Sequence, residues 1–270
     1  MNSAATLPPA PTRAALPPRT LGGLFDLIAF LASAVGLLLL VQFAALSLLV
    51  YNARERYPHL AWGELAKRIT ESVQYNAFFA VPVQLTYSAL VLLLLYALVR
   101  GRRGLPFWSS LALAPLHPAH VAAALAAGGL LSLIIQAANL LIPPPEPLAI
   151  DRLFSSRAAA WLVIAAGVLV APFVEELIFR GYIYTLLEQR WGMTSAVLAS
   201  GLLFGAIHFR QLYPGYFQMV LISVVGLVFS LARARAGTVL ASILLHFTYN
   251  ATLSLLFLLS PQFRNLPAAF

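Results

Sequence analysis

The chain has 270 residues, of which 61% are hydrophobic and only 10% are charged, with 17 basic and 9 acidic side chains. A soluble globular domain carries about 25% charged residues, so this composition excludes one and predicts a multi-span membrane protein. There is no cysteine, which excludes a disulfide framework, a thiolate zinc site, a cysteine nucleophile and an iron–sulfur cluster. The basic residues are almost all arginines in small groups between apolar runs, a pattern typical of span ends near anionic lipid rather than of nucleic-acid binding.

Residues 1–22 are rich in Ala and Pro and are predicted to form a disordered tail. Seven apolar runs of helix length follow, and only helices and closed barrels satisfy their backbone groups in lipid. We therefore predict an all-α, polytopic transmembrane helical bundle. The runs cover 27–50, 73–99, 119–142, 158–187, 193–209, 216–232 and 238–259.

The total is about seven or eight spans, because an eighth arises if 53–72 or 105–118 dips into the membrane. Charges recur through 53–72, which favours an interfacial helix there. The domain prediction places N-terminal transmembrane helices with interfacial segments at 23–157, further helices at 158–260 and a C-terminal tail at 261–270.

Orientation is finely balanced, because eight basic residues fall on each side of the predicted membrane. The positive-inside rule works best for short loops. The clusters at 100–103 and 233–235 lie in short loops on the side of the N-terminal tail. We therefore expect that side to be cytoplasmic.

Two adjacent carboxylates, Glu175 and Glu176, lie well inside the fourth apolar run. An ionisable group in a span costs roughly 2.5–3.5 kcal/mol on insertion, and it indicates a functional site by default. Glu176 and Arg180 are spaced i,i+4, so they can pair on one helix face. Glu175 points elsewhere and has no partner on its own helix, which makes it a candidate general base. The alternative is a buried ion-pair staple with a spare glutamate facing a water-filled crevice.

Two histidines lie on other predicted spans. His208 ends the fifth run, while His246 and Asn250 share one face of the seventh at i,i+4. A lone histidine in a span is more often a helix–helix hydrogen-bonding residue than a ligand. Two histidines on different helices, together with a glutamate pair, favour a polar catalytic cavity within the bilayer. Their depths, at 1.5 Å per residue, allow them to meet Glu175 at one level.

The three motifs Glu-Glu-x-x-x-Arg at 175–180, Phe-x-x-x-His at 204–208 and His-x-x-x-Asn at 246–250 resemble those of the CPBP family. These are the CAAX-protease and bacteriocin-processing intramembrane proteases, also called the Abi family, related to the Ras-converting CAAX endopeptidase. All three motifs stand in the family's order on separate spans. The resemblance identifies 158–260 as CPBP-type catalytic helices and does not extend to the N-terminal 150 residues.

The resemblance implies an intramembrane endopeptidase that hydrolyses peptide bonds of a membrane-associated protein or peptide. Glu175 would activate a water to attack the scissile carbonyl, with Glu176 and Arg180 as the supporting pair. His208 would orient that water or bind a metal. His246 and Asn250 would do the same or stabilise the oxyanion.

Two mechanisms stay open under this resemblance. In the first, zinc is held by His208, His246 and Glu175, since catalytic zinc takes three protein ligands and a water. In the second, no metal is used and Glu175 with His208 activates water directly. Asn250 is a poor zinc ligand and a good oxyanion donor, and the sequence does not decide between the two.

Other protease chemistries fit less well. A His-Glu-x-x-His zinc motif is absent, and Asp26 and Asp151 stand at span edges rather than inside the membrane. Ser200 lies in a sequence near the Gly-x-Ser-Gly of a rhomboid-like site, but Leu occupies the first Gly position. We interpret Ser200 as a packing residue, because Gly201 and Gly205 form a small-x-x-x-small face.

The expected partners are a membrane protein or peptide substrate and the lipid bilayer, with no nucleic acid. The preference for Arg over Lys and the Ala, Leu and Pro richness indicate a GC-rich bacterial genome, so we expect a multi-pass protein of the bacterial cytoplasmic membrane. Such a host lacks prenylated CAAX proteins, and that substrate is not assigned. The alternatives are a non-catalytic scaffold or bacteriocin-immunity protein, and a proton-coupled transporter, which the absence of internal repeats disfavours.

Overall fold

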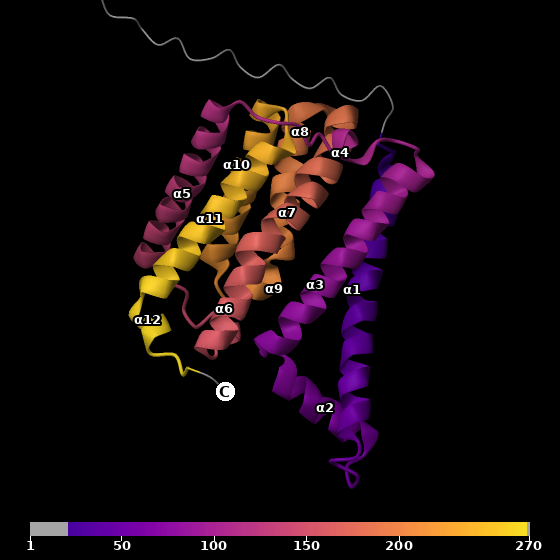
Figure 1. The fold of residues 1–270 in the computed structure, drawn as a ribbon, viewed down its shortest axis with the longest axis vertical. Coiled ribbons are helices and arrows are strands. Elements are labelled where there is room, and N and C mark those ends of the chain that lie inside the picture. The colour runs from indigo at the N-terminus through magenta and orange to yellow at the C-terminus, as the bar shows by residue number, and fades with distance from the viewer. Residues whose placement is uncertain (1–20, 269–270) are drawn as a thin grey trace, which may run out of the picture.

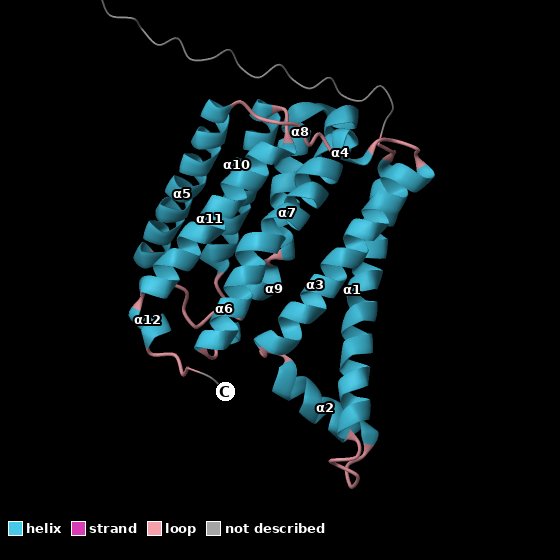
Figure 2. Ribbon diagram, viewed as in Figure 1, coloured by secondary structure: helices cyan, strands magenta, loops and turns pink. Residues whose placement is uncertain are grey.

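The computed structural model describes residues 21–268, and this range contains only helices and connecting segments (Figure 2). The predicted tail at 1–22 therefore lies outside the described residues apart from its last two. Leu21 is fully buried, and its backbone N–H donates to Gln189 Oε1 at 3.2 Å.

The N-terminal half contains three long helices and several short ones. Its elements are α1 (Leu24–Ala53), α2 (Trp62–Val73), α3 (Ala77–Tyr96), the π-helical turn η1 (Ala97–Arg102), α4 (Phe107–Ser110), α5 (Pro118–Leu141) and the 3-10 turn η2 (Asp151–Leu153). The segment predicted as an interfacial helix contains α2, which has 12 residues and is too short to cross a bilayer.

The C-terminal half begins with a helix interrupted twice by π-helical turns. Its elements are α6 (Arg157–Ala165), η3 (Ala166–Val170), α7 (Ala171–Glu176), η4 (Leu177–Ile183), α8 (Tyr184–Ile207), α9 (Phe209–Leu212), α10 (Tyr216–Ala236), α11 (Val239–Leu259) and α12 (Pro261–Arg264). The described part of the predicted C-terminal tail is folded, because Arg157 donates to the carbonyls of Arg264 and Pro267.

Six helical segments of the described chain are long and apolar enough to cross a membrane, so the prediction of a multi-pass helical membrane protein is confirmed. One of them, Arg157–Ile207, has 51 residues. A straight helix would place residues 175 and 208 about 50 Å apart, yet Glu175 Oε2 lies 4.0 Å from His208 Nε2. The chain therefore reverses direction within this segment. The total of seven or eight spans stays a prediction.

Gly192 makes the reversal. Its backbone has φ 79° and ψ 172°, inside what is otherwise continuous helix. Figure 1 shows the chain rising from α6 to α8 at one end of the bundle and returning to α9. The two arms, 157–191 and 193–207, correspond to the fourth and fifth runs predicted from the sequence.

Replacing Gly192 with Ala is expected to destabilise the protein by about 1–3 kcal/mol, because only glycine adopts this backbone conformation without strain. A Cβ at this position would meet nothing within 4 Å, so the whole effect comes from the backbone. Gly36→Ala in α1 is the matched control, since its Cβ also meets nothing and Ala is the better helix former. Unfolding in detergent micelles measures both, and equal stability of the two variants would contradict the prediction.

Close helix pairs hold the site helices together. A Cβ added to Gly201 of α8 would lie 2.8 Å from Leu227 Cδ2 of α10, and one added to Gly205 would overlap Ser223. The predicted small-x-x-x-small face is therefore confirmed as the contact between α8 and α10. On the other side α5 packs along α11, with Gly128 against the Leu245 carbonyl. In Figure 1, α1 and α3 form the edge opposite α5.

Asp26 stands at a span edge, in the first turn of α1, as the sequence predicts. Its side chain is buried, and its Oδ1 lies 3.1 Å from Arg102 Nη1 while its Oδ2 pairs with Arg103. It also accepts a hydrogen bond from the Gly23 N–H at 2.8 Å. Two arginines of the 100–103 cluster thus tie η1 to the start of α1.

Candidate functional site

The two glutamates end the short helix α7, which lies between two π-helical turns. Those turns cover 166–170 and 177–183. A π turn widens the helix and is frequent at functional sites. The glutamates therefore sit where the regular register of the long helix is interrupted on both sides.

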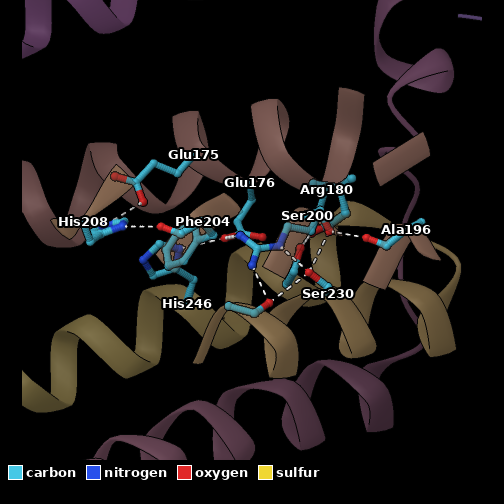
Figure 3. Close-up of polar contacts among 12 residues, drawn as sticks. Glu175, Glu176, Arg180, Ala196, Ser200, Phe204, His208, Ser230 and His246 are labelled. Carbon is cyan, nitrogen blue, oxygen red and sulfur yellow. Dashed lines mark hydrogen bonds and ion pairs between the residues drawn. The ribbon is translucent and has the colours of Figure 1, made fainter. Parts of the chain in front are cut away.

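Glu175 and His208 face each other across the two antiparallel arms (Figure 3). Glu175 Oε2 lies 4.0 Å from His208 Nε2, with 24% and 15% of the respective side chains exposed. His208 Nδ1 lies 2.7 Å from the Phe204 carbonyl oxygen. Because a carbonyl only accepts hydrogen bonds, Nδ1 must carry the proton. In the neutral ring Nε2 is then an acceptor directed toward Glu175.

Glu176 is fully buried and binds two cationic or polar groups with one oxygen. Its Oε1 lies 2.9 Å from Arg180 Nη1 and 2.9 Å from His246 Nδ1. The predicted Glu176–Arg180 pair is confirmed. The bond to His246 was not predicted, because it joins residues on different helices with no spacing rule to reveal it.

Arg180 is held by a polar and aromatic cradle that the sequence analysis missed. Its guanidinium donates to the Gly226 carbonyl at 2.6 Å and to Ser230 Oγ at 3.3 Å on α10. Its Cζ lies 4.6 Å from the centre of the Phe204 ring, a cation–π geometry.

Ser200 belongs to the same buried network. Its Oγ lies 2.9 Å from Ser230 Oγ and donates to the Ala196 carbonyl at 2.7 Å. Ser200 is fully buried and serves helix packing, as the sequence analysis inferred. It faces the Arg180 cradle and does not line the cavity described below.

Asn250 lies one turn beyond His246 on α11. Its Nδ2 donates to the Gly167 carbonyl of η3 at 2.7 Å. That carbonyl lies in a π-helical turn, where backbone bonding departs from the regular helix. Asn250 therefore ties α11 to the long helix that carries the glutamates, and one hydrogen of its amide remains for another acceptor.

A single cavity of about 830 Å³ brings the predicted catalytic residues together. Its wall includes Glu175, His208, His246 and Asn250. Glu176 and Arg180 lie behind that wall and are fully buried. The cavity also reaches α1 and α3, so the N-terminal helices form part of its lining.

The predicted zinc ligands do not come together as a set. Within residues 21–268 no group of three or more His, Cys, Asp or Glu side chains is placed to hold a metal ion. Glu175 approaches His208, whereas His246 is turned to Glu176. These donors do not fit a three-ligand zinc site, so we derive no step through a metal.

The region that carries the site residues, 157–252, is similar to known proteins. A family described as type II CAAX prenyl endopeptidase Rce1-like matches residues 157–252. An uncharacterised 24.3 kDa protein of Escherichia coli is 34% identical over 118 residues, which cover 42% of this chain and 52% of that protein. The chain thus spans about half the length of this curated relative. No solved structure matches the chain.

Proposed function

We propose that the chain is an intramembrane endopeptidase acting on a membrane-associated protein or peptide, because residues 157–252 match the Rce1-like CAAX prenyl endopeptidase family. The observation that carries the proposal is the approach of Glu175 to His208 at 4.0 Å in the wall of the cavity. This geometry supports catalysis by a glutamate-activated water, which is part of the proposal.

The separation of the two groups suits one bridging water. With Glu175 ionised and His208 neutral, both facing atoms are acceptors. A water that donates to each at about 2.8 Å holds them roughly 4.4 Å apart at its own bond angle, close to the observed 4.0 Å. Both water hydrogens are then engaged and its lone pairs are left to attack a carbonyl carbon. Glu175 takes the proton as that bond forms and passes it to the leaving amine.

The remaining residues support this step. We assign Asn250 to the developing oxyanion, because it lines the cavity and keeps one amide hydrogen for an acceptor. His246 lines the same wall with Nδ1 donating to Glu176, so it would donate to that oxygen through Nε2 only when its ring carries both protons. The carboxylate of Glu176 fixes the His246 ring through Nδ1. Arg180 neutralises that carboxylate within the bundle.

We further propose seven spans in the bacterial cytoplasmic membrane, counting the two arms around Gly192 separately. The end of the bundle that carries the start of α1 would be cytoplasmic. The zinc hypothesis, which the placement of these donors disfavours, is tested separately. Its test is metal analysis of purified wild type and His208→Ala, with activity measured after chelation. The metal-free mechanism expects equal metal content and unchanged activity, whereas loss of activity restored by zinc would overturn it.

The function itself is tested by reconstituting the wild type and Glu175→Ala in liposomes with a peptide library. We expect the wild type to cleave peptides and Glu175→Ala not to. Mass spectrometry of the products detects the cleavage. Equal cleavage by both proteins would refute the assignment of Glu175. Uptake of peptide without cleavage would favour a transporter. The absence of both cleavage and uptake would favour a scaffold or immunity protein.

A further inference from the structure

A second polar cluster lines the same cavity near the end of α5 and the start of α10. It consists of Gln136 and Asn139, one turn apart on α5, and Gln218 on α10. Gln218 is only 5% exposed, and the other two are half-buried. Polar side chains inside spans are costly and mark functional positions, and the mechanism above does not use these three.

The hydrogen bonds of Gln218 fix the direction of the amides. Its Nε2 lies 3.0 Å from the Ile142 carbonyl oxygen and 3.2 Å from Asn139 Oδ1. A backbone carbonyl only accepts, so the Gln218 atom must be the nitrogen, and its second partner must be the Asn139 oxygen. Asn139 therefore presents its Nδ2, with two N–H donors, and that nitrogen has no acceptor within residues 21–268.

Gln218 is held firmly in this position. Its oxygen lies so close to Gly215 that an added Cβ there would be 2.6 Å away. The Ile142 carbonyl follows the last turn of α5, where carbonyls lack helical partners. Gln218 thus both completes the end of α5 and sets the orientation of Asn139.

We propose that Asn139, together with Gln136, binds the peptide backbone of the substrate beside the cleaved bond. This inference rests on the proposed function and names the form of its substrate. The carbonyls of a helix are already bonded within the helix, so the Asn139 donors select a segment that is unwound and extended. Neutral amides match neutral carbonyls, and the cavity lining contains no Lys or Arg that would favour an anionic ligand.

The experiment measures peptide affinity separately from catalysis. A fluorescent peptide that the wild type cleaves is titrated into the Glu175→Gln protein in lipid nanodiscs. Adding Asn139→Leu is expected to weaken binding about tenfold, the size of one or two neutral hydrogen bonds. The control is Gln42→Leu, which makes a similar polar-to-apolar change at an exposed position of α1 and should leave the affinity unchanged.

Gln218 is a positioning residue in this scheme, so its effect should pass through Asn139. Gln218→Leu should weaken binding to a similar degree, and the double variant should bind no more weakly than Asn139→Leu alone. With Glu175 intact, Asn139→Leu should raise KM with kcat within about twofold, as expected for loss of uniform binding.

Peptides with single ester bonds locate the contact. An ester carbonyl is a weaker acceptor than an amide carbonyl, so one ester position should weaken binding to the Asn139 protein and not to Asn139→Leu. Unchanged affinity of Asn139→Leu would overturn the subsite and leave the peptidase proposal intact. Cleavage by Glu175→Gln would instead overturn the proposed mechanism, while the binding difference at Asn139 would still stand.

Discussion

Glu175→Gln is expected to lower kcat by about 10²–10⁴-fold, because a positioned general base contributes that much. The amide keeps the size of the carboxylate but cannot take a proton from water. Cleavage of a labelled peptide in proteoliposomes measures the effect. Peptide affinity should remain near that of the wild type, since the change removes proton transfer and leaves the cavity shape.

Two further variants sharpen this prediction. Glu175→Asp keeps a carboxylate but withdraws it by one methylene from His208, so it should retain more activity than Glu175→Gln. Glu71→Gln changes the same functional group at an exposed position of α2, where an ion pair contributes about 0–1 kcal/mol, and should be fully active. If the Glu175→Gln enzyme had the wild-type kcat, Glu175 would not be the general base. It would then be only an extra glutamate beside the structural Glu176–Arg180 ion pair.

The helices could be predicted closely from the sequence, because apolar runs of span length leave few alternatives in lipid. The run predicted at 238–259 is observed as Val239–Leu259, and that at 119–142 as Pro118–Leu141. The reversal at Gly192 was placed correctly as a gap between two runs. Its mechanism, a single glycine with positive φ, could not be read from composition.

Side-chain hydrogen bonds within one helix were predictable from spacing, whereas those between helices were not. The i,i+4 rule gave the Glu176–Arg180 pair, and the same spacing relates Phe204 to His208, whose ring binds the Phe204 carbonyl. The bond from His246 to Glu176 joins positions 70 residues apart. It depends on how α11 packs against α7, which no local pattern encodes.

Asn139 and Gln218 of the second polar cluster could not be predicted as site residues, for a different reason. Asn139 and Gln218 stand in or beside apolar runs, so their cost in a span was visible in the sequence. Nothing further in the sequence marks them as site residues, because these amides carry no charge and belong to no recognised motif. The arginine cluster at 100–103 has the sequence pattern of a topology signal. Arg102 and Arg103 instead pair with Asp26, which weakens their weight in the choice of orientation.

Arg180→Met is expected to destabilise the protein by about 3–5 kcal/mol, because it leaves the carboxylate of Glu176 buried without its main counter-charge. The unfolding transition in detergent measures this loss. The bond from His246 to Glu176 remains but cannot replace the guanidinium, which also bonds Gly226 and Ser230. Stability equal to that of the wild type would show that the pair contributes nothing to the fold.

The double variant Glu176→Leu/Arg180→Met separates the fold from the chemistry. Replacing a buried ion pair by apolar side chains of similar size is often neutral or stabilising, so most of the lost stability should return. Activity should not return, because His246 loses the carboxylate that holds its Nδ1 and fixes its ring in the cavity wall. A double variant that is both stable and fully active would mean that His246 needs no such support, and that the oxyanion depends on Asn250 alone.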